Sequence, residues 1–157
     1  MSPIWASGVA AMKRAAALQP LSREHLGALL AAKKLTEADD LEAARAAFLG
    51  FWEEDGRRHF RIEEEVLLPA WSLHAEIDEA GVRRMLDEHL AIRREALRLA
   101  GGEGSLEQVR SLGALLHDHV RFEERELFPA IEAALDIEIL DQLGKAIEAA
   151  EADQPPA

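Results

Sequence analysis

Two stretches of this chain share one pattern of histidine, arginine and glutamate, followed by proline and alanine. "HFRIEEEVLLPA" begins at His59 and "HVRFEERELFPA" begins at His119, and the two align without a gap. A shorter repeat, "EHL", occurs at Glu24–Leu26 and at Glu88–Leu90, roughly 30 residues before each long stretch. We interpret the chain as a duplicated helical hairpin, in which two similar helix pairs close on each other about an approximate two-fold axis.

Helical periodicity dominates the sequence, and no β-branched or aromatic alternation is long enough to predict a sheet. N-caps are predicted at Ser22, Thr36 and Ser105. The third helix is predicted over 79–100, and its inward stripe is assigned to Val82, Leu86, His89, Ile92, Ala96 and Leu99. A short fifth helix is predicted over 136–150. Short connections favour antiparallel neighbours, so we predict an all-α, up-down-up-down four-helix bundle with a short additional C-terminal helix. The expected organisation is an N-terminal arm at 1–20, the bundle at 21–150 and a flexible tail at 151–157.

Histidine and glutamate share the inward faces of the predicted helices. Residues four apart differ by about 40° in direction, so each histidine of the long repeat shares a face with the glutamate four residues later. One histidine also lies inside the apolar stripe of each helix that carries "EHL". Buried carboxylates without partners are costly, so polar groups that converge in a core need a cation. The predicted metal ligands are His25, His59, Glu63, His89, His119 and Glu123.

Each of these features has a structural alternative when it is taken alone. A single histidine on an apolar face is more often a hydrogen-bonded core residue, and a lone H-x-x-x-E is often a surface pair. Their recurrence in matched contexts favours metal binding. His117 is about 200° from His119 on the helix and is predicted to face away, and His74 is predicted to be solvated. Glu64 and Glu124 are about 140° from their histidines and are predicted to be solvated or to contact the ligands from outside.

The donor types narrow the choice of metal. Cysteine is absent, which excludes disulfides, thiolate zinc sites and iron–sulfur clusters. Imidazole with carboxylate suits iron, manganese or zinc better than calcium or magnesium. Six ligands could in principle close one octahedron around a single ion. Two carboxylates placed symmetrically fit better as bridges between two ions, each holding two imidazoles, with positions left open for a small molecule. The ferritin-like Glu-x-x-His spacing does not occur at any histidine of the chain.

Charge and hydropathy set expectations about partners. The formal net charge is −12, and so acidic a surface repels phosphate backbones, which argues against nucleic acid. No apolar run approaches the roughly 20 residues of a membrane span. The opening segment has its basic pair after the apolar residues, the reverse of a secretory signal. We therefore expect a cytoplasmic protein with neither nucleic-acid nor membrane partners, and a homo-oligomer remains open.

These motifs resemble the hemerythrin-like (HHE cation-binding) family over 22–134. The family signature has an inward histidine on helices one and three, and H-x-x-x-E followed by Leu-Pro or Leu-Phe-Pro on helices two and four. The segment "HVRFEERELFP" is a specific match. The resemblance implies a bundle that holds two non-heme iron ions, bridged by the two carboxylates and an oxo or hydroxo group, with manganese or zinc as alternatives. It implies dioxygen or nitric oxide as the small ligand.

The sequence also departs from the oxygen-carrying members of that family. Those members have a second histidine four residues away on helix three, where this chain has Met85 and Arg93 around His89. They also place the helix-four carboxylate five residues after the histidine, which keeps Glu124 as an alternative to Glu123. One iron is therefore expected to have an extra open position, and reversible oxygen carriage does not follow from the resemblance.

Three functions remain open at this point. The first is a metal-binding module that binds dioxygen or a related ligand and acts in oxygen, nitric oxide or iron sensing or storage. The alternative is a redox enzyme that consumes peroxide or nitric oxide at a diiron centre, although no tyrosine is available as a radical relay. The third is a structural bundle whose histidines bind nothing. No catalytic residue is assigned.

Overall fold

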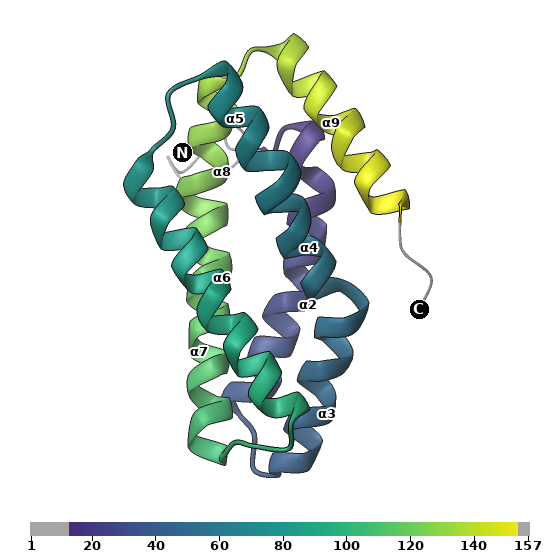
Figure 1. Cartoon of the computed structure of the whole chain (residues 1–157), viewed down its shortest axis with the longest axis vertical. Coiled ribbons are helices and arrows are strands. Elements are labelled where there is room, and N and C mark those ends of the chain that lie inside the picture. The colour runs from purple at the N-terminus through teal and green to yellow at the C-terminus, as the bar shows by residue number, and fades with distance from the viewer. Residues whose placement is uncertain (1–12, 154–157) are drawn as a thin grey trace, which may run out of the picture.

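The chain folds into a bundle of helices, which confirms the all-α class. The structure is a computed structural model that describes residues 13–153, and no strand occurs within that range. Its long helical segments lie side by side along the long axis of the molecule (Figure 1). Most of the predicted arm, including Trp5, lies outside the described residues, and so do residues 154–157 of the predicted tail. The boundaries at 20 and 150 remain predictions.

Two successive helix pairs account for most of the bundle. The N-terminal pair combines one helix with a longer rod: α2 (Gln19–Thr36), then α3 (Leu41–Phe51), η2 (Trp52–Gly56), α4 (Arg57–Ile62), η3 (Glu63–Leu67) and α5 (Leu68–His74). The C-terminal pair repeats this plan: α6 (Glu79–Ala100), then α7 (Leu106–Phe122), η4 (Glu123–Leu127) and α8 (Phe128–Ala134). A short turn, η1 (Ala16–Leu18), precedes α2, and α9 (Ile137–Ala152) follows the second rod.

Local capping explains where the helices begin. The hydroxyl of Ser105 accepts a backbone N–H in the first turn of α7, as predicted. The prediction for Ser22 is wrong, because α2 begins earlier, with Pro20 in its first turn, where proline is favoured. The prediction for Thr36 is also wrong, because this residue ends α2 and the side chain of Asp40 caps α3 instead.

Two apolar clusters fill the bundle on either side of a buried polar layer. The cluster toward the α2–α3 connection includes Leu35, Phe48, Trp52, Ile92 and Leu116. The cluster toward α8 and α9 includes Leu21, Trp71, Met85, Phe128 and Ile131. The inward assignment of Leu86 is wrong: Met85 is fully buried in its place, and Leu86 is 41% exposed. The helical phase of α6 is otherwise as predicted, with Ile92, Ala96 and Leu99 buried.

Each rod changes from α-helical to π-helical hydrogen bonding at a predicted metal ligand. In η3 the N–H of Leu68 donates to the carbonyl of Glu63, and in η4 the N–H of Phe128 donates to the carbonyl of Glu123. A proline follows each of these turns, and proline has no N–H with which to continue the α-helical ladder. Single π-helical turns are frequent at functional sites. The repeated "LPA" and "FPA" segments therefore accompany the backbone change that positions these two glutamates.

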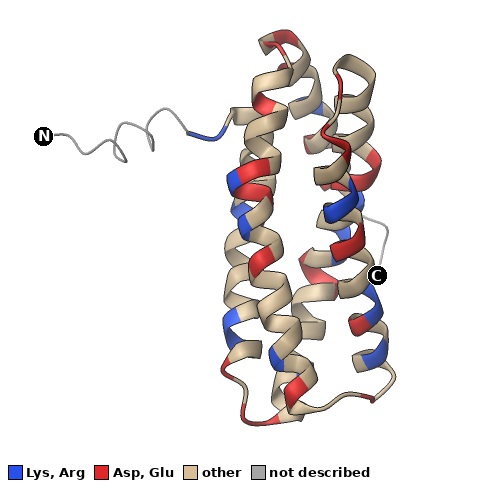
Figure 2. Cartoon of the chain, turned by 90° about the vertical axis from the view of Figure 1, so that its left-hand side faces the viewer, with Lys and Arg blue, Asp and Glu red and all other residues tan. Residues whose placement is uncertain are grey.

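Charged side chains cover the outer faces of the helices. Acidic and basic positions are interspersed with uncharged ones along the helices in Figure 2. α9 packs against η1 and η3 and so covers one flank of the N-terminal pair (Figure 1). Across residues 13–153, no helix combines the length and the apolar character that crossing a membrane requires.

Candidate metal centre

Six polar side chains form the buried layer between the two apolar clusters, and they are the six that the sequence singles out. α2, α4, α6 and α7 each contribute one imidazole, and η3 and η4 each contribute one carboxylate. Both carboxylates have 0% exposure. The layer consists of His25, His59, Glu63, His89, His119 and Glu123. The structure thus brings every predicted ligand together, and their role as ligands remains a prediction.

The two carboxylates of the layer, Glu63 and Glu123, are called the inner glutamates below. Glu63 lies 3.2 Å from Nε2 of His59 through Oε2 and 3.2 Å from Nε2 of His89 through Oε1. Glu123 lies 3.2 Å from Nε2 of His119 through Oε2 and 2.9 Å from Nε2 of His25 through Oε1. Each inner glutamate therefore joins an imidazole of its own helix pair to an imidazole of the other pair.

The ligand atoms fall into two groups that share both inner glutamates. One group adds His25 and His59 from the N-terminal pair, and the other adds His89 and His119 from the C-terminal pair. Within each group one atom from every residue lies within 4.8 Å of the others. This arrangement offers two adjacent cation positions with matched donors, two nitrogens and two carboxylates each.

The hydrogen bonds of the layer are incomplete without a cation. Both carboxylate oxygens of Glu63, one oxygen of Glu123 and the Nε2 atoms of His89 and His119 are buried without a hydrogen-bond partner. Several of these atoms lie at ion-pair distance from one another, but their alignment does not satisfy hydrogen-bond geometry. Buried polar atoms are normally paired, so these unpaired oxygen and nitrogen atoms fit a bound metal ion. Imidazole with carboxylate suits iron, manganese or zinc.

The charges of the layer stabilise protonated imidazoles in the metal-free protein. Burial lowers the pKa of His89, but the close carboxylates of Glu123, Glu63 and Glu64 outweigh this effect and raise the pKa to about 10. Burial also lowers the pKa of His119, and the charge of Glu123 raises it to about 9. Burial raises the pKa of Glu123, yet the charge of His119 and imidazole hydrogen bonds hold it well below its ordinary value. The raised pKa values thus favour a proton on Nε2 of His89 and of His119, the atoms that would bind a metal.

A second set of carboxylates, the outer glutamates, contacts the imidazoles from the opposite side. Each imidazole donates its Nδ1–H to one of them, since an ionised carboxylate only accepts. The pairs are His25 with Glu124 at 2.8 Å, His59 with Glu24 at 2.9 Å, His89 with Glu64 at 2.6 Å and His119 with Glu88 at 3.0 Å. All four imidazoles therefore have Nδ1 directed outward and Nε2 directed at the inner glutamates.

The structure distinguishes the two glutamates that the sequence left as alternatives by their positions relative to the buried layer. Glu123 lies in the layer, whereas Glu124 lies outside it, with Ser22 as a second partner. His117 and His74 are exposed, as predicted. Sequence reasoning missed Glu24 and Glu88 as partners of the layer, although the repeated "EHL" segment was the signal for both.

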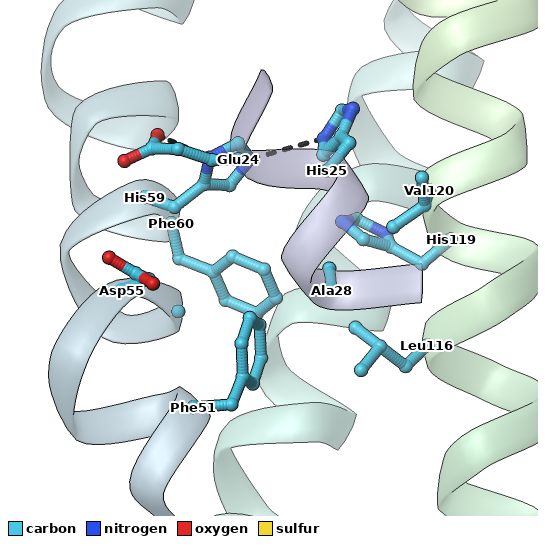
Figure 3. Close-up of a pocket in the computed structure, with 11 residues that line it drawn as sticks. Glu24, His25, Ala28, Phe51, Asp55, His59, Phe60, Leu116, His119 and Val120 are labelled. Carbon is cyan, nitrogen blue, oxygen red and sulfur yellow. Dashed lines mark hydrogen bonds and ion pairs between the residues drawn. The ribbon is translucent and has the colours of Figure 1, made fainter. Parts of the chain in front are cut away.

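A pocket reaches the layer from the side, between α2, η2 and α7. The cavity itself has a volume of about 10 Å3, about the space that one water-sized molecule needs. Glu24 and Asp55 are the acidic residues of its lining, and the other residues labelled in Figure 3 are imidazoles or apolar side chains. The apolar part of the lining is formed by Ala28, Phe51, Phe60, Leu116 and Val120. Three imidazoles, those of His25, His59 and His119, line the same pocket.

Comparison with known families agrees with this geometry. The model of the hemerythrin HHE cation-binding domain matches residues 16–131, most of the chain. The chain belongs to the hemerythrin HHE cation-binding domain family. The match includes both helix pairs and all six residues of the layer. No curated protein and no solved structure gives a significant match to the chain.

Family membership and the geometry support the same coarse conclusion. This hemerythrin-family chain carries a buried histidine–glutamate cluster that is compatible with metal binding.

Proposed function

We propose that this hemerythrin-family protein holds two non-heme iron ions and binds dioxygen or a related small ligand such as nitric oxide, in oxygen, nitric oxide or iron sensing or storage. The observation that carries the proposal is the pair of ligand groups that share both inner glutamates. Each group contains two of the four imidazoles, so an ion in one group alone would leave the Nε2 atoms of the other two without a metal. When bound, an iron pair supplies reversible ligand binding and one-electron redox changes.

The residues of the layer have distinct parts in this proposal. His25 and His59 would hold one ion and His89 and His119 the other. The inner glutamates would be shared, and their two negative charges offset the charge of the cations. The apolar clusters on both sides exclude water, which strengthens electrostatic interactions within the layer. The up-down-up-down order of a four-helix bundle is part of the same proposal, supported by two rods that each carry one H-x-x-x-E.

The lateral pocket supports a small, uncharged ligand. Its walls near the layer are apolar, and its two acidic residues, Glu24 and Asp55, are both paired with Arg58, so the lining offers an ion no unpaired charge. Its size favours a molecule of a few atoms over a metabolite. Dioxygen and nitric oxide meet both requirements.

Elemental analysis and the visible spectrum of iron-loaded protein test the proposal. We expect about two iron ions per chain and absorption bands from ligand-to-iron charge transfer. His119→Ala is expected to lose iron, and His117→Ala, which removes an exposed imidazole two residues away, is the matched control. Less than one ion per chain after iron-replete expression would contradict the proposal. Steady-state consumption of peroxide or nitric oxide by the loaded protein would instead assign a redox enzyme.

A further inference from the structure

Each outer glutamate contacts an arginine as well as an imidazole. The shortest distances from a guanidinium nitrogen to a carboxylate oxygen are 3.1 Å for Arg58 with Glu24, 3.0 Å for Arg93 with Glu64, 3.2 Å for Arg84 with Glu88 and 3.5 Å for Arg14 with Glu124. An arginine–glutamate–imidazole series is therefore present at all four imidazoles of the layer. Four unrelated surface ion pairs would not be expected to connect an arginine, a glutamate and a buried imidazole in the same order each time.

The four contacts form a closed ring around the bundle. Glu24 on α2 reaches the imidazole on α4, and Glu64 on η3 reaches the imidazole on α6. Glu88 on α6 reaches the imidazole on α7, and Glu124 on η4 reaches the imidazole on α2. Each helix or rod thus holds the imidazole of the next one in the chain, and the last returns to the first.

Such contacts determine the tautomer and the orientation of an imidazole that binds a metal. A carboxylate that accepts from Nδ1–H fixes the tautomer in which Nε2 carries the lone pair, and it fixes the orientation of the ring. An arginine on the same carboxylate keeps it ionised and limits its rotation. Glu64 accepts from Nδ1 of His89 at 2.6 Å and from the guanidinium of Arg93 at 3.0 and 3.2 Å. Arg93 therefore acts on His89 through Glu64.

We propose that the outer glutamates are positioning residues, each of which sets the metal affinity of the imidazole on the next helix. The proposal rests on the metal centre proposed above. It assigns Glu64 and Glu88 to the ion of the C-terminal pair, and Glu24 and Glu124 to the ion of the N-terminal pair. Glu64 belongs to the N-terminal pair, so its substitution affects the ion held by the opposite pair.

Competition titration of iron(II) against a chromophoric chelator under anaerobic conditions tests this assignment. The variants are Glu64→Ala and Glu64→Gln, and the control is Glu65→Ala, which removes a neighbouring glutamate whose contact is with exposed Arg61. We expect Glu64→Ala to weaken one of two ions by about 10–100-fold and to leave the other within about threefold. The amide of Glu64→Gln still accepts from Nδ1–H and should restore part of the affinity. Glu65→Ala should match the wild type.

The outcomes separate the two proposals. A wild-type protein that binds no iron overturns the metal centre and the positioning role together. A wild-type protein with two tight ions, alongside a folded Glu64→Ala variant with the same two affinities, overturns the positioning role alone. Equal weakening of both ions indicates a general loss of structure and also overturns it. Circular dichroism of the metal-free variants checks folding, and Glu88→Gln provides the same test if Glu64→Ala does not fold.

Discussion

The N-terminal and C-terminal helix pairs are alike in their polar residues and differ in the apolar residues beside them. Each pair supplies two imidazoles, one inner glutamate and two outer glutamates to the centre. The residue three positions after the "EHL" histidine is Ala28 in the first pair and Ile92 in the second. The residue three positions before the H-x-x-x-E histidine is Gly56 in the first pair and Leu116 in the second. At these two matching positions the N-terminal pair thus has small residues and the C-terminal pair has large ones.

This difference determines from which side the centre can be reached. The lateral pocket is lined by Ala28 and Gly56, and Leu116 forms its far wall. A Cβ at position 56 would lie 2.8 Å from the ring of Trp52 and 2.9 Å from that of Phe51. Glycine at this position therefore leaves room for the two rings. The pocket therefore meets the buried layer beside Ala28, in the N-terminal pair. We expect a small ligand to reach the layer from this side.

The largest expected effect comes from removing the inner glutamates, which tests the symmetry of the chemistry. Glu63→Ala and Glu123→Ala should each lose both ions, because each carboxylate belongs to both ligand groups. Each should also destabilise the protein by about 3–5 kcal/mol, the usual result of leaving buried charges without a partner. Glu126→Ala, on the exposed face of η4, is the control. Iron content and urea unfolding measure both effects, and loss of only one ion in either variant would contradict the shared role.

A second prediction concerns the pH dependence of the metal-free protein. The pKa values of His89 and His119 are raised to about 10 and about 9 in the folded chain, against about 6.5 when unfolded. Folding therefore binds protons between these values, and the stabilisation is complete below about pH 6.5 and is lost as pH rises through 9 to 10. Urea unfolding of chelator-treated protein should show a falling free energy of unfolding over that window. A constant value would contradict the protonated layer.

The same protons link metal binding to pH. Because iron must displace them from Nε2, loading at pH 7 should release protons, and the apparent metal affinity should rise with pH. Calorimetric titration in two buffers of different ionisation enthalpy measures the release directly. Identical heats in the two buffers would show that no proton is displaced.

A smaller effect is expected from filling the pocket, which tests the one-sided access. Ala28→Leu should lower the affinity of the iron(II)-loaded protein for nitric oxide by about tenfold or more, since overpacking costs about 1–3 kcal/mol. Ile92→Leu introduces the same residue at the matching position of the other pair and conserves volume, so it should leave nitric oxide binding unchanged. Iron content must stay at the wild-type level in both variants. Equal losses in the two variants would contradict access from the Ala28 side.

The smallest effect is expected from the arginines that contact the outer glutamates. Arg84 is 46% exposed and Arg93 is 29% exposed, and exposed ion pairs contribute about 0.2–1 kcal/mol. Arg93→Gln should therefore lower iron affinity by about fivefold or less, and Arg84→Gln should have the smaller effect of the two. The difference from the wild type should shrink as salt rises, because salt screens exposed pairs. A salt-independent loss would point to packing in place of charge.

Sequence periodicity was sufficient for the inner layer and insufficient for what surrounds it. Glu63 and Glu123 were predictable because a four-residue step fixes their direction relative to the histidine on the same helix. Glu24 and Glu88 were missed because each precedes a ligand by one residue and turns toward the neighbouring helix, and a single helix does not encode its neighbour's position. Leu86 was misplaced for a related reason: Met85 and Leu86 lie four and three residues before His89 and both fit the stripe, but only Met85 is buried in the apolar cluster toward α8 and α9.

The pocket could not be predicted for a similar reason. Alanine and glycine are common where helices pack closely, so Ala28 and Gly56 do not by themselves predict a pocket. Their small size is informative only when they are compared with Ile92 and Leu116, the residues at the matching positions of the other pair.

The most direct test of the account is an anomalous diffraction map, recorded at the iron absorption edge from crystals of the iron-loaded protein. The account predicts two peaks per chain in the buried layer, one beside His25 and His59 and one beside His89 and His119, with the inner glutamates between them. A single peak, or a layer without any anomalous signal in protein that contains iron, would contradict it.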